Sequence, residues 1–183
     1  RANLKKLNFY PEPLILSATA SMNAEGTTLD NMIGDIHFGD LLLIRDKYIY
    51  RLDTLNIVAK VDTGQKTLTA NSNLFDFQIA GNYNLSTLPN AIKNMVNHYT
   101  NGNDTIVYEP QIAKYELSIK NADKLMAIFY PDIQVVRNLK VSGDFNTGTN
   151  NFTTRLRVGQ FNYDNILLDT LLVEARTIND KLE

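Results

Sequence analysis

The feature that most restricts the fold is the alternation of apolar and polar residues between Tyr48 and Tyr83. Successive side chains of a β-strand point to opposite faces, so this alternation predicts strands with one apolar face. The clearest run extends from Phe75 to Leu85, where every second residue is apolar or glycine. The sequence Asp62-Thr63-Gly64-Gln65 is typical of a hairpin turn, and it predicts antiparallel neighbours.

The alternation changes phase inside this stretch. Tyr50 and Leu52 are apolar at even positions, whereas Leu55 and Ile57 are apolar at odd positions. A slip of one residue turns every later side chain to the wrong face of a sheet. A β-bulge at Asp53-Thr54, which inserts one residue and bends the strand, is expected to correct the slip.

Part of this stretch is repeated near the C-terminus. Leu168-Asp169-Thr170-Leu171 repeats Leu52-Asp53-Thr54-Leu55, and aligning Tyr50–Lys60 with Ile166–Arg176 gives five identities. The second copy changes phase at the same place. A repeated structural unit is therefore expected.

The rest of the chain predicts about a dozen short strands and two short helices. The first helix starts after Ser86 or Thr87, has Pro89 in its first turn and carries apolar residues at helical spacing. The second is expected from Ala122 to Tyr130, before Pro131. The prediction is a mainly β, mostly antiparallel segment with two sub-units, at about 1–100 and 101–183.

Composition excludes several classes of function. The chain has 183 residues and a net charge of −2, with no block of either sign, so the basic patch of a nucleic-acid-binding protein is absent. It has no cysteine, which excludes disulfides and thiolate sites. Its longest apolar runs, such as Leu41–Ile44, are too short for a membrane-spanning helix. Since the chain starts at Arg1 without a signal peptide, we expect it to be a piece of a longer protein, whose anchoring lies elsewhere.

No pattern predicts catalysis, a metal site or a cofactor. His37 and His98 have no nearby carboxylate at zinc-ligand spacing, and we expect structural or surface roles for both. The repeated Asp53 and Asp169 could form an acid–base pair or a calcium site. Alternatively, each could satisfy backbone groups at its bulge. The second interpretation is favoured, because neither position gathers the several oxygen ligands that calcium needs.

Several short segments along the chain resemble sequences of one protein family. They are Leu29-Asp30-Asn31-Met32-Ile33-Gly34, Tyr50-Arg51-Leu52-Asp53-Thr54-Leu55, Gly81-Asn82-Tyr83-Asn84-Leu85-Ser86-Thr87-Leu88-Pro89, Ser118-Ile119-Lys120-Asn121, Phe129-Tyr130-Pro131, and Ser142-Gly143-Asp144-Phe145-Asn146 followed by Asn151-Phe152. In this order they resemble the TamB-like translocation and assembly module proteins of the AsmA-like superfamily, in their DUF490-type region and Bacteroidetes-type form. None of these segments is a catalytic motif.

The resemblance implies a fold, a location and partners. The fold would be a curled sheet, described as a β-taco or half-open sandwich, with an apolar groove. The parent protein would be anchored in the inner membrane and extend through the periplasm. Its partners would be phospholipid acyl chains and an outer-membrane barrel protein of the TamA or BamA type. The family implies no enzymatic activity.

The first hypothesis for function is a segment that shields acyl chains during phospholipid transport between the two membranes, or that supports outer-membrane protein assembly. The residues expected to line its groove are Leu55, Ile57, Ala59, Phe75, Phe77, Ile79, Tyr83, Leu171 and Val173. The alternative is a closed-core β module of a surface or periplasmic lipoprotein. Such a module would act as a scaffold and contact protein partners through its sheet edge.

Overall fold

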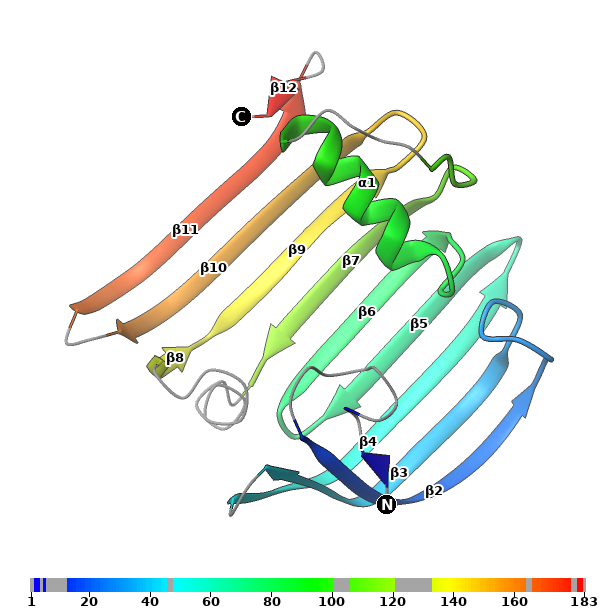
Figure 1. The fold of residues 1–183 in the computed structure, drawn as a ribbon, viewed down its shortest axis with the longest axis vertical. Helices are drawn as coiled ribbons and strands as arrows, with labels where there is room; N and C mark the ends of the chain where they lie inside the picture. The colour runs from blue at the N-terminus through cyan, green and yellow to red at the C-terminus, as the bar shows by residue number, and fades with distance from the viewer. Residues whose placement is uncertain are drawn as a thin grey trace.

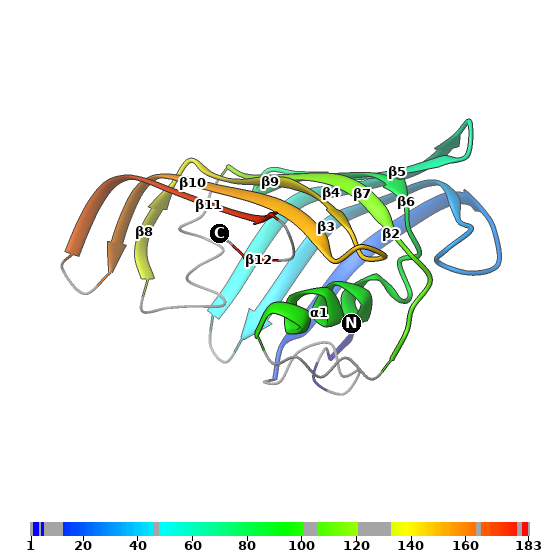
Figure 2. The ribbon, with the colours of Figure 1, turned by 90° about the horizontal axis from the view of Figure 1, so that it is seen from above.

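The protein is one curled antiparallel sheet with a helix on its concave side (Figures 1 and 2). The computed structural model describes residues 2–3, 5, 13–45, 48–100, 106–120, 133–163, 166–178 and 181–182. Its strands are β1 (Ala2–Asn3), β2 (Ile15–Glu25), β3 (Ile33–Arg45), β4 (Tyr48–Asp62), β5 (Gln65–Ser72), β6 (Phe75–Asn82), β7 (Ile112–Ile119), β8 (Ile133–Arg137), β9 (Leu139–Asn146), β10 (Asn151–Tyr163), β11 (Ile166–Ile178) and β12 (Lys181–Leu182).

The strands follow one another across the sheet almost in chain order. The order is β1-β2-β3-β4-β5-β6-β7-β9-β10-β11-β12, and β8 pairs with β10. The first and last strands do not join, so the sheet is open. This confirms the prediction of a mainly β, curled, mostly antiparallel fold.

One helix, α1 (Leu88–Thr100), is present among the residues that the structure describes. It begins as the sequence predicts, because the carbonyl oxygen of Thr87 accepts the first helical hydrogen bond, from the amide of Ala91 at 3.0 Å. The second predicted helix, from Ala122 to Tyr130, lies outside the described residues.

The change of phase in the apolar–polar alternation of β4 is not produced by the β-bulge that the sequence predicts at Asp53-Thr54. Pairing between β3 and β4 keeps one register on both sides of Asp53, which faces Asp40. Asp40 has a φ of 50°, and the register shift falls instead between β2 and β3. Phe38 and Leu41, three residues apart, consequently pack in the same apolar cluster. The slip is shared by two paired strands, so no mispairing arises between them.

The second copy has an equivalent break. Thr170 in β11 has a φ of 63° and faces Gly159, as Thr54 faces Gly39 in the first copy. Gly159 in turn faces Asn138, which lies between β8 and β9 and has a φ of 54°. Both of these strands pair with β10, and they do so in the same register on either side of Asn138. Asn138 and Thr170 thus lie at the same level of the sheet, on either side of Gly159 in the continuous strand β10.

The repeated aspartates bind side chains, not the backbone groups expected from the sequence. The amide Nδ2 of Asn73 donates to Oδ2 of Asp53 at 3.0 Å. The amide Nε2 of Gln160 donates to Oδ1 of Asp169 at 3.4 Å. Each carboxylate therefore links its strand to a neighbouring chain segment beside the break.

The left-handed conformation of Thr170 gives a stability test with a matched control. A β-branched residue in this conformation is strained by about 1–2 kcal/mol, whereas glycine adopts it freely at an entropic cost of about 0.5–1 kcal/mol. Thr170→Gly should raise the free energy of unfolding by about 0.5–1 kcal/mol. Thr54→Gly, at the equivalent position without a positive φ, should lower it by about 0.5–1 kcal/mol. Denaturant unfolding measures both, and equal destabilisation by the two changes would contradict the strained break.

Candidate functional site: the apolar concave face

The register of the strands aligns apolar residues across the whole concave face. One residue from each of nine strands contributes to this line, which we call the apolar row: Met22, Ile36, Ile57, Ala70, Phe77, Leu117, Val141, Leu156 and Val173. Neighbouring strands lie about 4.8 Å apart, so the row extends for about 38 Å. Every described member is at least partly accessible to solvent.

The opposite, convex face is polar. The neighbouring line of paired residues is Asp35, Val58, Thr69, Gln78, Glu116, Ser142, Arg155 and Glu174, of which only Val58 is apolar. The Nε of Arg155 lies 2.6 Å from Oε1 of Glu174 in an exposed ion pair. Water therefore solvates one face, while the other face needs an apolar cover.

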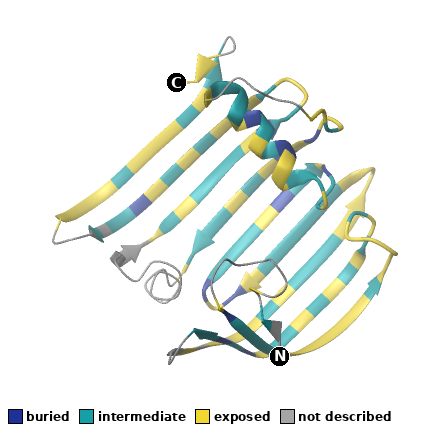
Figure 3. Ribbon diagram, in the orientation of Figure 1, coloured by how far each residue is buried: buried dark blue, intermediate teal, exposed yellow. Residues whose placement is uncertain are grey.

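Three buried clusters divide the concave face (Figure 3). At one end Leu14 covers Leu41, Leu43 and Leu74. The middle cluster lies under α1. A third surrounds Val158. Toward the two edges the row is open, since Met22 is 66% and Val173 is 45% exposed.

The helix is held over the sheet by polar contacts at its N-terminal end. Asp30, in the β2–β3 connection, accepts hydrogen bonds from the backbone amide of Ser86 at 2.9 Å and from its hydroxyl. These bonds lower the pKa of the Asp30 carboxyl below its ordinary value of 3.8. Lys66 donates from Nζ to the carbonyl of Tyr83 at 2.8 Å and to Asn84 at 3.0 Å.

A buried glutamine completes this attachment. Gln111 is 1% exposed, and its Oε1 accepts the amide of Asn84 at 2.9 Å. Its Nε2 donates to Oγ1 of Thr87 at 3.1 Å. Because the glutamine amide is satisfied on both sides, it can be buried without a large desolvation cost. The segment before α1 is thus fixed to the start of β7.

Beside α1 lies a cavity of about 320 Å³ with an almost entirely apolar wall. It is lined by Phe77, Ile79, Leu88, Ile92, Met95, Val96, Tyr115, Phe145, Phe152 and Thr154. The hydroxyls of Tyr115 and Thr154 are hydrogen bonded to each other at 2.6 Å. Since Phe77 belongs to the apolar row, the cavity is continuous with it. These walls suit hydrocarbon better than a polar ligand.

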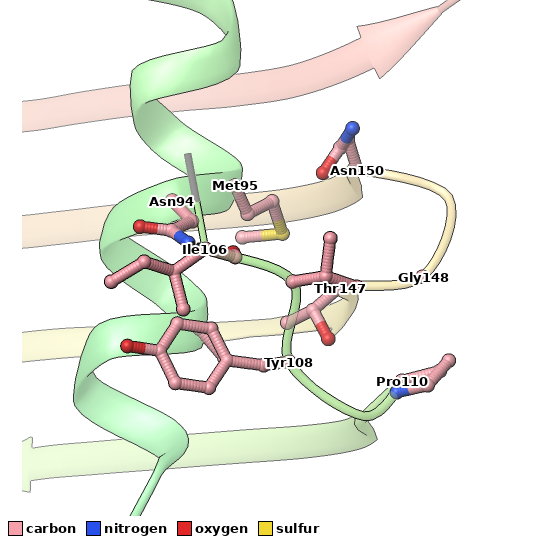
Figure 4. Close-up of a pocket in the computed structure, with 10 residues that line it drawn as sticks. Asn94, Met95, Ile106, Tyr108, Pro110, Thr147, Gly148 and Asn150 are labelled. Atoms are coloured by element: carbon pink, nitrogen blue, oxygen red, sulfur yellow. Dashed lines mark hydrogen bonds between the residues drawn. The ribbon is translucent and has the colours of Figure 1, made fainter. Parts of the chain in front are cut away.

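A second pocket, of about 290 Å³, lies between the helix, the 106–110 segment and the β9–β10 turn (Figure 4). Asn94 and Met95 project into it from α1, and Thr147 and Asn150 come from the β9–β10 turn. The amide of Asn94 donates to the carbonyl of Ile106 at 2.6 Å. The hydroxyl of Tyr99 donates to the carbonyl of Asn150 at 2.7 Å. These contacts attach the C-terminal half of the helix to the segment before β7 and to the β9–β10 turn.

The nine residues predicted to line a groove all belong to the concave side but fall into different environments. Ile57, Phe77 and Val173 are in the apolar row, and Ala59 lies in the next line beside Leu68. Leu55 and Phe75 pack on the Leu14 cluster, and Leu171 packs on Val158. Ile79 and Tyr83 are each 3% exposed, so they belong to the buried core beneath α1 and do not line an open groove.

Sequence reasoning did not assign six members of the row: Met22, Ile36, Ala70, Leu117, Val141 and Leu156. Their own strands alternate, so the signal was present in each. What the sequence lacks is the register that places them opposite one another.

The fold and this face define a class: an open, curled antiparallel sheet with an apolar concave face that one helix partly covers. The chain matches no protein-family model, no curated protein and no solved structure. Within the part of the chain that the structure describes, no helix is long and apolar enough to cross a membrane. No group of three or more possible ligand side chains in that part is placed to hold a metal ion.

The Asp30–Ser86 contact predicts a pH dependence of stability. Because folding lowers the pKa of Asp30, its contribution is complete above pH 3.8 and is lost as the pH falls through the lower pKa of the folded state. Asp30→Ala should therefore destabilise the protein at neutral pH, and its difference from wild type should shrink below about pH 4. Urea unfolding between pH 2 and 7 measures this difference. Asp62→Ala is the control for removing a carboxylate elsewhere, and a difference that grows in acid would contradict the assignment.

Proposed function

We propose that the chain is a non-enzymatic segment of a periplasmic envelope-biogenesis protein, anchored in the inner membrane through its parent, that shields phospholipid acyl chains from water. The observation that carries the proposal is the apolar row, which crosses nine strands on one face while the other face is polar. Large continuous apolar surfaces on soluble domains mark binding sites.

An acyl chain lying along the row would be stabilised by the hydrophobic effect. Each methylene removed from water contributes about 0.8 kcal/mol, and the open ends at Met22 and Val173 allow entry from either edge. The row itself contains no polar side chain, so it would select for hydrocarbon and not for a head group. A polar head group would remain outside the curl, in water.

The helix limits where a chain can lie. It covers the part of the face over Ile79, Ala113 and Phe145, where the core is closed. The remaining path follows the row through Phe77 and Leu117, past the 320 Å³ cavity beside α1. We expect bound hydrocarbon to lie along this path and to contact Val96, which is 42% exposed on the helix.

Two further considerations support this proposal. The resemblance to TamB-like proteins implies phospholipid transport and outer-membrane protein assembly with a barrel partner, and a lipid-shielding sheet fits that role. The alternative, a closed-core scaffold module, requires the concave face to be dry. The open sheet and the partly accessible row favour the lipid-binding hypothesis over it.

A pair of adjacent residues on β11 tests the proposal. Val173 and Leu172 are 45% and 55% exposed, but only Val173 is in the apolar row, because successive strand residues point to opposite faces. Val173→Asp places a charge where hydrocarbon would lie and should weaken phospholipid binding at least about tenfold, whereas Leu172→Asp should leave it unchanged. Native mass spectrometry of the protein mixed with phospholipid in mild detergent measures the bound fraction.

A second variant within the covered part of the row is Phe77→Asp, with Gln78→Asp as its control on the convex face. Circular dichroism first checks that each variant folds, because Phe77 is partly buried and Val173 is not. Unchanged phospholipid binding in folded Val173→Asp and Phe77→Asp would contradict the proposed function. Equal loss in the convex-face controls would contradict it as well.

A further inference from the structure

The apolar cavity beside α1 has one polar feature. Eight of its ten lining residues are apolar, and the other two, Tyr115 and Thr154, have their hydroxyls 2.6 Å apart. Both side chains are partly buried. Ligand pockets are commonly apolar with a few placed polar groups, which fix the orientation of the ligand. This hydroxyl pair is therefore the part of the wall that can orient a bound lipid.

The fold brings the two residues together across an intervening strand. Tyr115 in β7 and Thr154 in β10 both pair with Gly143 of β9, from its two sides. Two strand spacings separate their backbones by about 10 Å, and the long tyrosine side chain spans most of this gap. Gly143 leaves the space for it, because a Cβ at this position would lie 2.8 Å from the hydroxyl oxygen of Tyr115. The phenol thus extends over β9 to reach Thr154.

The hydroxyl pair has one hydrogen left to donate. Two hydroxyls carry two hydrogens, and the contact between them uses one, whichever oxygen is the donor. In the part of the chain that the structure describes, neither oxygen has a further hydrogen-bond partner. The second hydrogen can therefore be donated to an acceptor that enters the cavity.

The walls of the cavity favour a neutral acceptor. None of the ten lining residues is charged, so a carboxylate or a phosphate would enter without a counter-ion and at a high desolvation cost. The ester carbonyl of a phospholipid is a neutral acceptor that is joined directly to an acyl chain. It therefore matches an apolar cavity that offers one hydroxyl hydrogen.

We propose that the Tyr115–Thr154 hydroxyl pair donates a hydrogen bond to an acyl ester carbonyl of a bound phospholipid. This inference rests on the proposed function and adds a fixed point to it. On β7, Tyr115 lies two residues from Leu117 of the apolar row and on the same face, so the pair is about 7 Å from the row. The acyl chain would run from the carbonyl onto the row, and the phosphate would remain in water.

A comparison of ester and ether lipids tests the inference without any substitution. Dialkyl phosphatidylcholine can have the same head group and chain length as diacyl phosphatidylcholine, but it lacks both carbonyls. Native mass spectrometry of the wild-type protein with an equal mixture in mild detergent should show about fivefold more bound ester lipid, the effect of one net hydrogen bond. Equal binding of the two lipids would overturn the inference and leave acyl-chain shielding intact. Binding of neither lipid would overturn both proposals.

Removing both hydroxyls should abolish the preference for the ester lipid. The double variant Tyr115→Phe, Thr154→Val keeps the shape of the wall, whereas either single change would leave one hydroxyl with its hydrogen free to donate. The matched control, Thr153→Val, removes a hydroxyl from the opposite face of the same strand and should keep the preference. Circular dichroism checks that each variant folds. A folded double variant that still prefers the ester lipid would contradict the inference.

Palmitate distinguishes a phospholipid ester from a free fatty acid as the source of the carbonyl. At neutral pH palmitate is a carboxylate, so an equal concentration should displace little of the bound ester lipid. Displacement of most of that lipid would overturn the assignment to a phospholipid ester.

Discussion

A single layer of β-sheet has two faces, and in this protein only the polar face can be left to water. The convex face meets this requirement with charged and hydroxyl side chains, including the Arg155–Glu174 ion pair. The apolar row gives the concave face an apolar residue in each strand from β2 to β7 and from β9 to β11, and α1 with the Leu14 segment covers only parts of this face. The uncovered remainder includes the two ends of the apolar row, where Met22 is 66% and Val173 is 45% exposed. Curvature brings its members toward one another but does not bury them.

The curl depends on local breaks in the strands as well as on the usual twist. Asp40, Asn138 and Thr170 have φ values of 50°, 54° and 63°, in a region that few residues other than glycine adopt. In β3, the residues on either side of Asp40 pack into one cluster, so the break keeps apolar side chains on the concave face. Because each break is matched by the strand opposite, the pairing of β3 with β4 and of β10 with β11 continues in one register. The repeated sequence therefore marks an irregular position in both copies, with the positive φ on Asp40 of the neighbouring strand in the first copy and on Thr170 itself in the second.

The sequence contained enough information for the class of fold and for much of the candidate site. Alternation from Phe75 to Leu85 predicted a strand, and β6 covers Phe75–Asn82 of it. The pattern after Thr87 predicted α1. Alternation also placed Ile57, Phe77 and Val173 on one face. These features are local, so they can be read from neighbouring residues.

The features that the sequence did not predict depend on distant residues. Asp30 and Ser86 are 56 residues apart in the sequence, and their hydrogen bond helps to hold α1 over Tyr83. Tyr83, which was predicted to line the groove, is therefore buried in the core. The break at Asp53 was expected to affect one strand, but its partner Asp40 lies on the neighbouring strand and carries the unusual backbone. Leu117 and Val141 joined the candidate site only through the register of β7 and β9.

Methyl NMR with a phospholipid that carries a nitroxide on its acyl chain shows whether hydrocarbon lies along the apolar row. Ile57, Val141 and Val173 in the row, and Val58 and Leu172 on the convex face, supply the reporting methyl groups. We expect strong paramagnetic broadening of the methyl signals of the three row residues and little change in those of the two convex-face residues. Equal broadening on both faces, or broadening confined to the convex face, would contradict it.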